Sequence, residues 1–91
     1  MAKVVVTLKI MPESPSVNLD NLQKAVLKEI KNFIGETETK VEKEAIGFGL
    51  NALKILFVMD ENKKSDVIEE RARKIKNVQS AEIIDVRRAI G

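Results

Sequence analysis

The sequence predicts an α+β fold in which two helices cover one face of a four-stranded antiparallel sheet. Three observations carry this prediction. Apolar residues alternate at every second position in two stretches, as in strands with a buried face, and they recur at helical spacing in two others. The segments follow one another as β-α-β-β-α-β. Hydrophobic residues make up 44% of the chain and charged residues 33%, which is usual for a domain with a packed core.

Residues 3–11 form the first predicted strand. One face of this strand is apolar and comprises Val4, Val6, Leu8 and Ile10. Pro12 and Pro15 follow within a short segment, and each lacks a backbone N–H and disfavours helix in the residue before it. The strand therefore ends at about residue 11, and a loop follows.

A helix begins at Leu19, where the apolar period changes from two residues to that of a helix. Its apolar stripe comprises Leu19, Leu22, Val26, Ile30 and Phe33. Asn18 is well placed as the N-cap, and Gly35 can serve as the C-cap.

Two strands are expected on either side of the tripeptide 47–49. Residues 36–46 are rich in charge but include Thr37, Thr39, Val41 and Ile46, which predicts a polar strand at the edge of the sheet. Residues 50–59 are apolar on both faces, which is typical of a central strand.

The second helix follows a turn at 60–64. Ser65 or Asp66 caps it, and Asp66 with Glu69 has the spacing of a capping box. The stripe of this helix comprises Val67, Ile68, Ala72 and Ile75. Asn77 closes it.

Residues 78–86 form the last strand, and residues 87–91 remain as a tail. With two right-handed crossovers, this order predicts the ferredoxin-like plait, built as one domain over residues 1–91. The plait hosts acylphosphatases, regulatory small-molecule domains, RNA-recognition modules and metal chaperones, so the fold alone selects no function.

Composition excludes several kinds of chemistry. Cysteine and histidine are both absent, which removes disulfides, zinc sites and Cys or Ser-His nucleophiles. We therefore expect no catalytic residue, no metal site, no cofactor and no enzyme activity. The net charge is only +2, and the three aromatic residues are all Phe, so base stacking and direct nucleic-acid binding are not expected. No apolar run is long enough to span a membrane, and a cytoplasmic location fits the lack of Cys.

Three features remain as candidates for binding. Lys24, Lys28 and Lys31 share one side of the first helix, where they form either an anion-facing ridge or, as we favour, a solvated face. The segment Gly47-Phe48-Gly49 either presents Phe48 outward as an anchor or folds its ring back over the sheet. Arg87 and Arg88 are either a functional basic pair or a solvated tail.

Three separated segments carry a resemblance to a known family. They are Met11-Pro12-Glu13-Ser14-Pro15, Ile46-Gly47-Phe48-Gly49-Leu50-Asn51-Ala52-Leu53 and Asp85-Val86-Arg87-Arg88. Together they resemble the archaeal elongation factor 1-beta family over essentially the whole chain. Gly47-Phe48-Gly49 and the run at 78–80 are also similar to the C-terminal exchange domain of the eukaryotic factor.

The resemblance implies a guanine-nucleotide exchange factor that promotes GDP release from elongation factor 1-alpha, binding this GTPase in its GDP-bound and nucleotide-free states. It implies that Phe48, between Gly47 and Gly49, buries itself in the GTPase surface. It further implies that Arg88, or Arg87, reaches toward the magnesium site of the GTPase. The eukaryotic pattern has Lys near the chain end, whereas here Arg follows Arg and three residues extend beyond.

Two other classes of function fit the same architecture. One is a small-molecule-binding regulatory domain, which would dimerise through its sheet edges and bind an amino acid. The other is a purely structural subunit of a synthetase or elongation complex.

Overall fold

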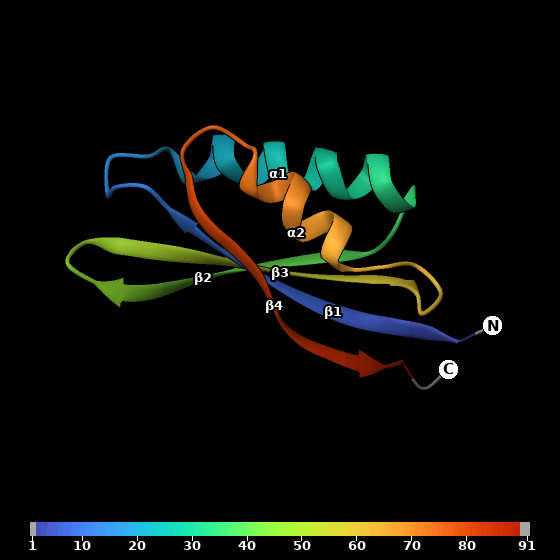
Figure 1. Ribbon diagram of the computed structural model, residues 1–91. Coiled ribbons are helices and arrows are strands. Elements are labelled where there is room, and N and C mark those ends of the chain that lie inside the picture. Colours follow the sequence, from blue (N-terminus) through green and yellow to red (C-terminus); the bar gives the residue numbers. More distant parts are fainter. Residues whose placement is uncertain (1, 90–91) are drawn as a thin grey trace.

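The computed structural model describes residues 2–89 and has six elements in the order that the sequence predicts. The elements are β1 (Lys3–Pro12), α1 (Leu19–Ile34), β2 (Thr39–Gly47), β3 (Leu50–Asp60), α2 (Asp66–Arg73) and β4 (Val78–Arg88). Figure 1 shows one layer of strands with both helices above it.

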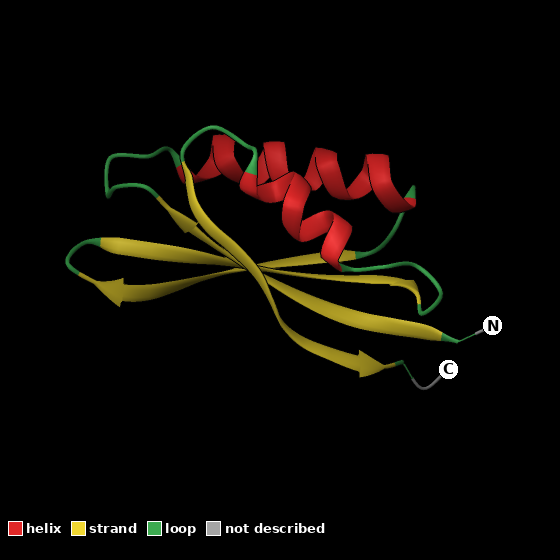
Figure 2. Ribbon diagram, in the orientation of Figure 1, coloured by secondary structure: helices red, strands yellow, loops and turns green. Residues whose placement is uncertain are grey.

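The four strands form one sheet in the order β2-β3-β1-β4, and all neighbours are antiparallel. Both helices lie on the same face, and no helix or strand of residues 2–89 covers the other face, which we call the open face (Figure 2). This arrangement confirms the ferredoxin-like plait. It also confirms β2 as an edge strand and β3 as a central one.

The core lies between the sheet and the helices. Its largest fully buried side chains are Phe57, Leu8, Ile10, Ile30, Leu53, Ile55, Ile68, Val6 and Val26. Strand residues of this set fall at every second position, and those of α1 fall four apart. The apolar faces predicted for the strands and for the helices therefore pack against each other in one core.

The ends of α1 are those predicted. The side chain of Asn18 accepts a hydrogen bond of 3.1 Å from the N–H of Asn21, which satisfies one of the free donors of the first turn. Gly35 has φ +81° and donates its N–H to the carbonyl of Lys31 at 2.8 Å.

The predicted capping box of α2 does not form. Ser65 is the N-cap, yet its side chain makes no capping hydrogen bond. Glu69 accepts a hydrogen bond from the N–H of Ile83 on β4 instead. The carboxylate of Glu69 therefore makes a tertiary contact with β4 in place of the local capping contact with the start of α2. The helix also ends at Arg73, so Ile75 lies beyond it, and Asn77 with φ +75° turns the chain into β4.

Two strand boundaries differ from the prediction by more than one residue. β2 begins at Thr39 rather than at residue 36. β4 continues to Arg88, so the expectation of a free tail from residue 87 is wrong for both arginines. Arg87 and Arg88 pair with Val5 and Val4 on β1, and Ala89 donates its N–H to the carbonyl of Lys3 at 2.9 Å. Pairing with β1 therefore keeps this segment extended; residues 90–91 of the predicted tail lie outside the described residues.

The two ends of the sheet differ in structure. At one end lies the turn between β2 and β3, beside the loop that follows β1. At the other end lie the start of β1 and the ends of β3 and β4 (Figure 1). The 11 residues of β3 connect the two ends, a distance of about 33 Å at the usual rise of a strand.

Candidate functional site

The turn between β2 and β3 holds the most exposed apolar side chain of the described residues. Phe48 is 100% exposed, so its ring does not fold back over the sheet. It lies at the first of two positions between the paired residues Gly47 and Leu50. Phe48 has φ +54° and Gly49 has φ +78°. Positive φ at both central positions is the requirement of a type I′ hairpin turn.

The glycines serve the backbone conformation of this turn. Gly47 has φ +125° and Gly49 has φ +78°, both in the region that side chains resist. Space is not the constraint, because a β-carbon built on Gly49 would lie 3.6 Å from Pro15 Cβ, in ordinary contact, and one built on Gly47 would meet nothing within 4 Å. The sharp turn is what aims the ring of Phe48 at solvent.

Phe48 has an apolar neighbour that the sequence analysis did not single out. Between the pairs Ala45–Asn51 and Gly47–Leu50 the register shifts by one residue, which makes Ile46 the extra residue of a β-bulge. Ile46 is 42% exposed. The sequence shows that Ile46 and Phe48 flank Gly47. It does not show that Ile46 is exposed, because the β-bulge at this position has no sequence signature.

Arg87 and Arg88 lie at the other end of the sheet and project from opposite faces. Arg88 is opposite Val4, which packs against the core, and Arg87 is opposite Val5. Successive side chains of a strand alternate, so Arg88 is on the helix side and Arg87 is on the open side.

Each arginine has an acidic partner. Arg88 donates from Nε at 3.3 Å and from Nη2 at 3.1 Å to Oε2 of Glu61. Arg87 Nε lies 2.9 Å from Oδ2 of Asp85. The arginine side chains remain 73% and 81% exposed, so these pairs are weak and a binding partner can exchange them.

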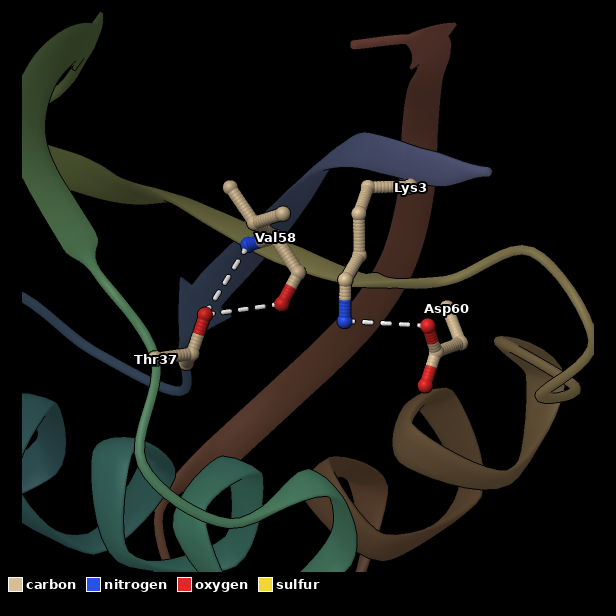
Figure 3. Close-up of polar contacts among 4 residues, drawn as sticks. All are labelled: Lys3, Thr37, Val58 and Asp60. Carbon is tan, nitrogen blue, oxygen red and sulfur yellow. Dashed lines mark hydrogen bonds and ion pairs between the residues drawn. The ribbon is translucent and has the colours of Figure 1, made fainter. Parts of the chain in front are cut away.

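The same end carries a third charged pair, shown in Figure 3. Nζ of Lys3 on β1 lies 2.9 Å from Oδ1 of Asp60 at the end of β3. The hydrogen bond and charge of this ammonium group lower the pKa of Asp60. Thr37 completes the adjacent edge of β3, because its hydroxyl donates to the carbonyl of Val58 at 2.7 Å and accepts from the Val58 N–H at 3.3 Å. Neither contact was predicted from the sequence, because the partners Lys3 and Asp60, and Thr37 and Val58, are far apart along the chain.

Ion pairs connect three strands near the centre of the open face of the sheet. Glu44 on β2 pairs with Lys54 on β3, and Oε1 of the same carboxylate lies 4.0 Å from Nζ of Lys9 on β1. The contact with Lys54 lowers the pKa of Glu44 and raises that of Lys54. Glu44 therefore lies between two ammonium groups, and the three charges sum to +1.

The lysines of α1 form no concentrated site. Lys24, Lys28 and Lys31 are all exposed, and Lys31 Nζ lies 2.8 Å from Oε1 of Glu36. The hydrogen bond and charge of Glu36 raise the pKa of Lys31.

The described residues offer little to a metal or a small ligand. No group of three acidic, His or Cys side chains among them could hold a metal ion. The roomiest of the hollows found among them, about 200 Å³, lies between α1 and residues 75–77. It is smaller than the pockets that small molecules generally use. No helix in residues 2–89 is long and apolar enough to cross a membrane.

Known sequences resemble the chain over nearly its whole length. The family model described as "EF-1 guanine nucleotide exchange domain" matches residues 5–89. Elongation factor 1-beta of Methanobrevibacter smithii is 42% identical over 90 residues, covering 97% of this chain and 98% of that protein. Elongation factor 1-beta of Pyrococcus abyssi is 39% identical over 87 residues, covering 93% of each.

The fold also occurs in a protein with a different origin. The de novo designed protein Foldit4 superposes with a TM-score of 0.63 over 98% of both chains, at 22% sequence identity. At that identity the likeness concerns the fold alone.

Proposed function

Because this chain belongs to the EF-1 guanine nucleotide exchange domain family, and is therefore a guanine nucleotide exchange factor of translation elongation, we propose that its partner is the GTPase elongation factor 1-alpha. The proposed contact has two parts, one at each end of the sheet. The factor makes and breaks no covalent bond, and it acts in the cytoplasm without direct contact with nucleic acid or membrane.

The first part is the hairpin tip. Phe48 is fully exposed on a turn held by Gly47 and Gly49, and this observation carries the proposal. A large ring that is already presented loses little conformational freedom when it enters a pocket, and buried aromatic anchors supply much of the energy of protein interfaces. Ile46 adds apolar surface beside it.

The second part is the basic end of β4. We assign the approach to the magnesium site to Arg88, with Arg87 as the alternative. A guanidinium group has a fixed positive charge, and a positive charge placed near Mg²⁺ opposes binding of the ion and so of the phosphates that it bridges. The arginines and the hairpin tip lie at opposite ends of β3, which is about 33 Å long, so a GTPase that contacts both must span the length of the sheet.

Exchange then follows from linkage. If the exchange factor binds the nucleotide-free GTPase more tightly than the GDP-bound form, it lowers the affinity of the GTPase for GDP by the same ratio. No nucleophile or acid-base pair is needed. The binding energy of Phe48 holds the complex together while the basic end weakens the nucleotide site.

The test is release of a fluorescent GDP analogue from elongation factor 1-alpha, with and without this chain. We expect wild-type chain to accelerate release and Phe48→Ala to lose most of that effect at the same concentration. Lys28→Ala, on the exposed side of α1, is the control and should behave as wild type. If Phe48→Ala accelerates release as well as wild type, the hairpin tip is not the anchor.

A further inference from the structure

We infer that β4 pairs with β4 of a second copy of this chain, antiparallel and centred on Val86. β4 is an edge strand of the sheet, and β1 is the one strand of residues 2–89 that pairs with it (Figure 1). The inference concerns the segment 84–88, which includes Arg87 and Arg88 of the proposed GTPase contact; its test reads the oligomeric state of the chain alone and does not depend on the GTPase.

The backbone of this segment has groups free to pair. The N–H of Ala89 points to β1, where it meets the carbonyl of Lys3. Backbone N–H and C=O groups alternate in direction along a strand. Those of Asp85 and Arg87 therefore also point to β1, while those of Val86 and Arg88 point away from the sheet. Within residues 2–89, nothing hydrogen-bonds to the outward N–H and C=O of Val86.

The earlier half of the same edge is closed by α2. Glu69 Oε2 accepts from the N–H of Ile83 at 2.6 Å, and Arg73 Nε donates to the carbonyl of Ala81 at 3.0 Å. Beyond these contacts the edge exposes two apolar side chains, Ile84 at 44% and Val86 at 50%. An exposed strand edge with apolar side chains is a surface that another strand can extend.

The charges of this segment complement themselves. Asp85 and Arg87 flank Val86 on the open side of the sheet. A two-fold antiparallel register centred on Val86 puts each Asp85 opposite Arg87 of the second copy, and opposite charges in that position stabilise strand pairs. In the single chain these two residues hold each other at 2.9 Å on the surface, so the pair need only change partners.

The other edge of the sheet fits a second copy less well. On β2, Lys40 and Glu42 flank Val41 in a similar way. A register centred on Val41, however, brings Glu38, which directly precedes β2, opposite Glu44 of the second copy, and like charges in that position are unfavourable. β2 also exposes no large apolar side chain from Thr39 to Ala45. The geometry therefore favours β4.

Charge exchange tests the pairing in sedimentation velocity over a concentration series. We expect reversible dimerisation of the wild type. Asp85→Arg and Arg87→Asp should each raise the dissociation constant at least about tenfold, because each replaces two opposite-charge pairs by two like-charge pairs. An equimolar mixture of the two variants should dimerise close to the wild-type level, since opposite charges again face each other. The double variant should do so by itself.

Glu42→Arg is the matched control, because it makes the same change of charge within a similar pair on β2, and it should leave the dimer intact. Circular dichroism and thermal unfolding confirm that each variant is folded. The inference is wrong if wild-type chain stays monomeric at millimolar concentration. It is equally wrong if the single variants dimerise as wild type does, if mixing them restores nothing, or if Glu42→Arg alone dissociates the dimer.

Discussion

Phe48 occupies a backbone position that its own side chain disfavours. The first central residue of this turn has φ +54°, where Asn and Gly are usual and a bulky residue is strained. Its ring gains nothing within the chain, because it is fully exposed. A residue that costs stability and makes no internal contact suits the interface role proposed for it.

Phe48→Asn should therefore separate stability from activity. We expect the free energy of unfolding to rise by about 0.5–1 kcal/mol, because Asn adopts positive φ more easily. We expect the complex with elongation factor 1-alpha to weaken by about 2 kcal/mol or more through loss of the anchor. Chemical denaturation and a GDP-release titration measure the two quantities. A variant that loses stability and activity together would show that the ring supports the fold.

Arg88 is expected to act on the nucleotide site more than on the affinity of the complex. Arg88→Ala should slow assisted GDP release in the presence of Mg²⁺, and Arg88→Lys should retain part of the activity because it keeps the charge. The defect of Arg88→Ala should shrink when Mg²⁺ is removed by a chelator, since a charge that opposes the ion then has nothing to oppose.

Arg87→Ala is the matched control, because Arg87 is the next residue and projects from the other face of the sheet. An equal defect of Arg88→Ala with and without Mg²⁺ would make Arg88 an ordinary docking residue. If Arg87→Ala alone gives the magnesium-dependent defect, the role belongs to Arg87.

The hairpin of β2 and β3 depends on its turn as an element. Gly49 has φ +78°, and a β-carbon added there would lie in ordinary contact with Pro15, so backbone strain is the main cost of a substitution. Gly49→Val should lower the free energy of unfolding by about 1–2 kcal/mol, because a β-branched residue resists positive φ. Gly49→Asn is the control and should cost much less. Thermal unfolding of the two variants decides: equal midpoints would mean that the turn relaxes to accept any residue.

The contact between α2 and β4 is the other element-scale dependence. Glu69 reaches across to the N–H of Ile83 at 2.6 Å in a partly buried setting. Glu69→Ala leaves that donor without its partner, so we expect a loss of about 1–3 kcal/mol in the free energy of unfolding. Glu70→Ala, at the next and exposed position of α2, should change stability little. Denaturant titration of both variants makes the comparison, and a loss as large for Glu70→Ala would trace the effect to the helix itself.

At the scale of the whole molecule, paired carboxylates link stability to pH. The pKa of Asp60 is lowered by Lys3, and that of Glu44 by Lys54. Because these groups hold protons less tightly in the folded chain than in the unfolded one, stability rises with pH through this range. The gain is complete above the ordinary carboxyl pKa of about 4 and is lost as pH falls through the lower folded values.

Asp60→Asn should therefore match the wild type in stability at pH 2 and fall below it at pH 7. Glu82→Gln, an exposed carboxyl on β4, is the control. Denaturant titrations at several pH values measure the difference between each variant and the wild type. A difference for Asp60→Asn that stays constant from pH 2 to pH 7 would show that the ion pair with Lys3 contributes nothing.

The local sequence by itself determined the order of elements, both ends of α1 and which strand faces form the core. These features depend on the alternation of apolar residues and on caps such as Asn18, where the interacting groups are a few residues apart. The glycines at 47 and 49 likewise predicted a turn. Residues 46–53 carried part of the resemblance by which the family was identified.

Only the tertiary structure decided what happens where distant segments meet. Arg87 and Arg88 were predicted to lie in a tail, because no neighbouring residue in the sequence requires a strand there. Pairing with β1 nevertheless keeps them in β4. Glu69 satisfies Ile83 in place of a local cap. The distance between the hairpin tip and the basic end follows from the length of β3 in the folded sheet. In each case the deciding partner is remote along the chain, and only folding brings its hydrogen-bonding groups within reach.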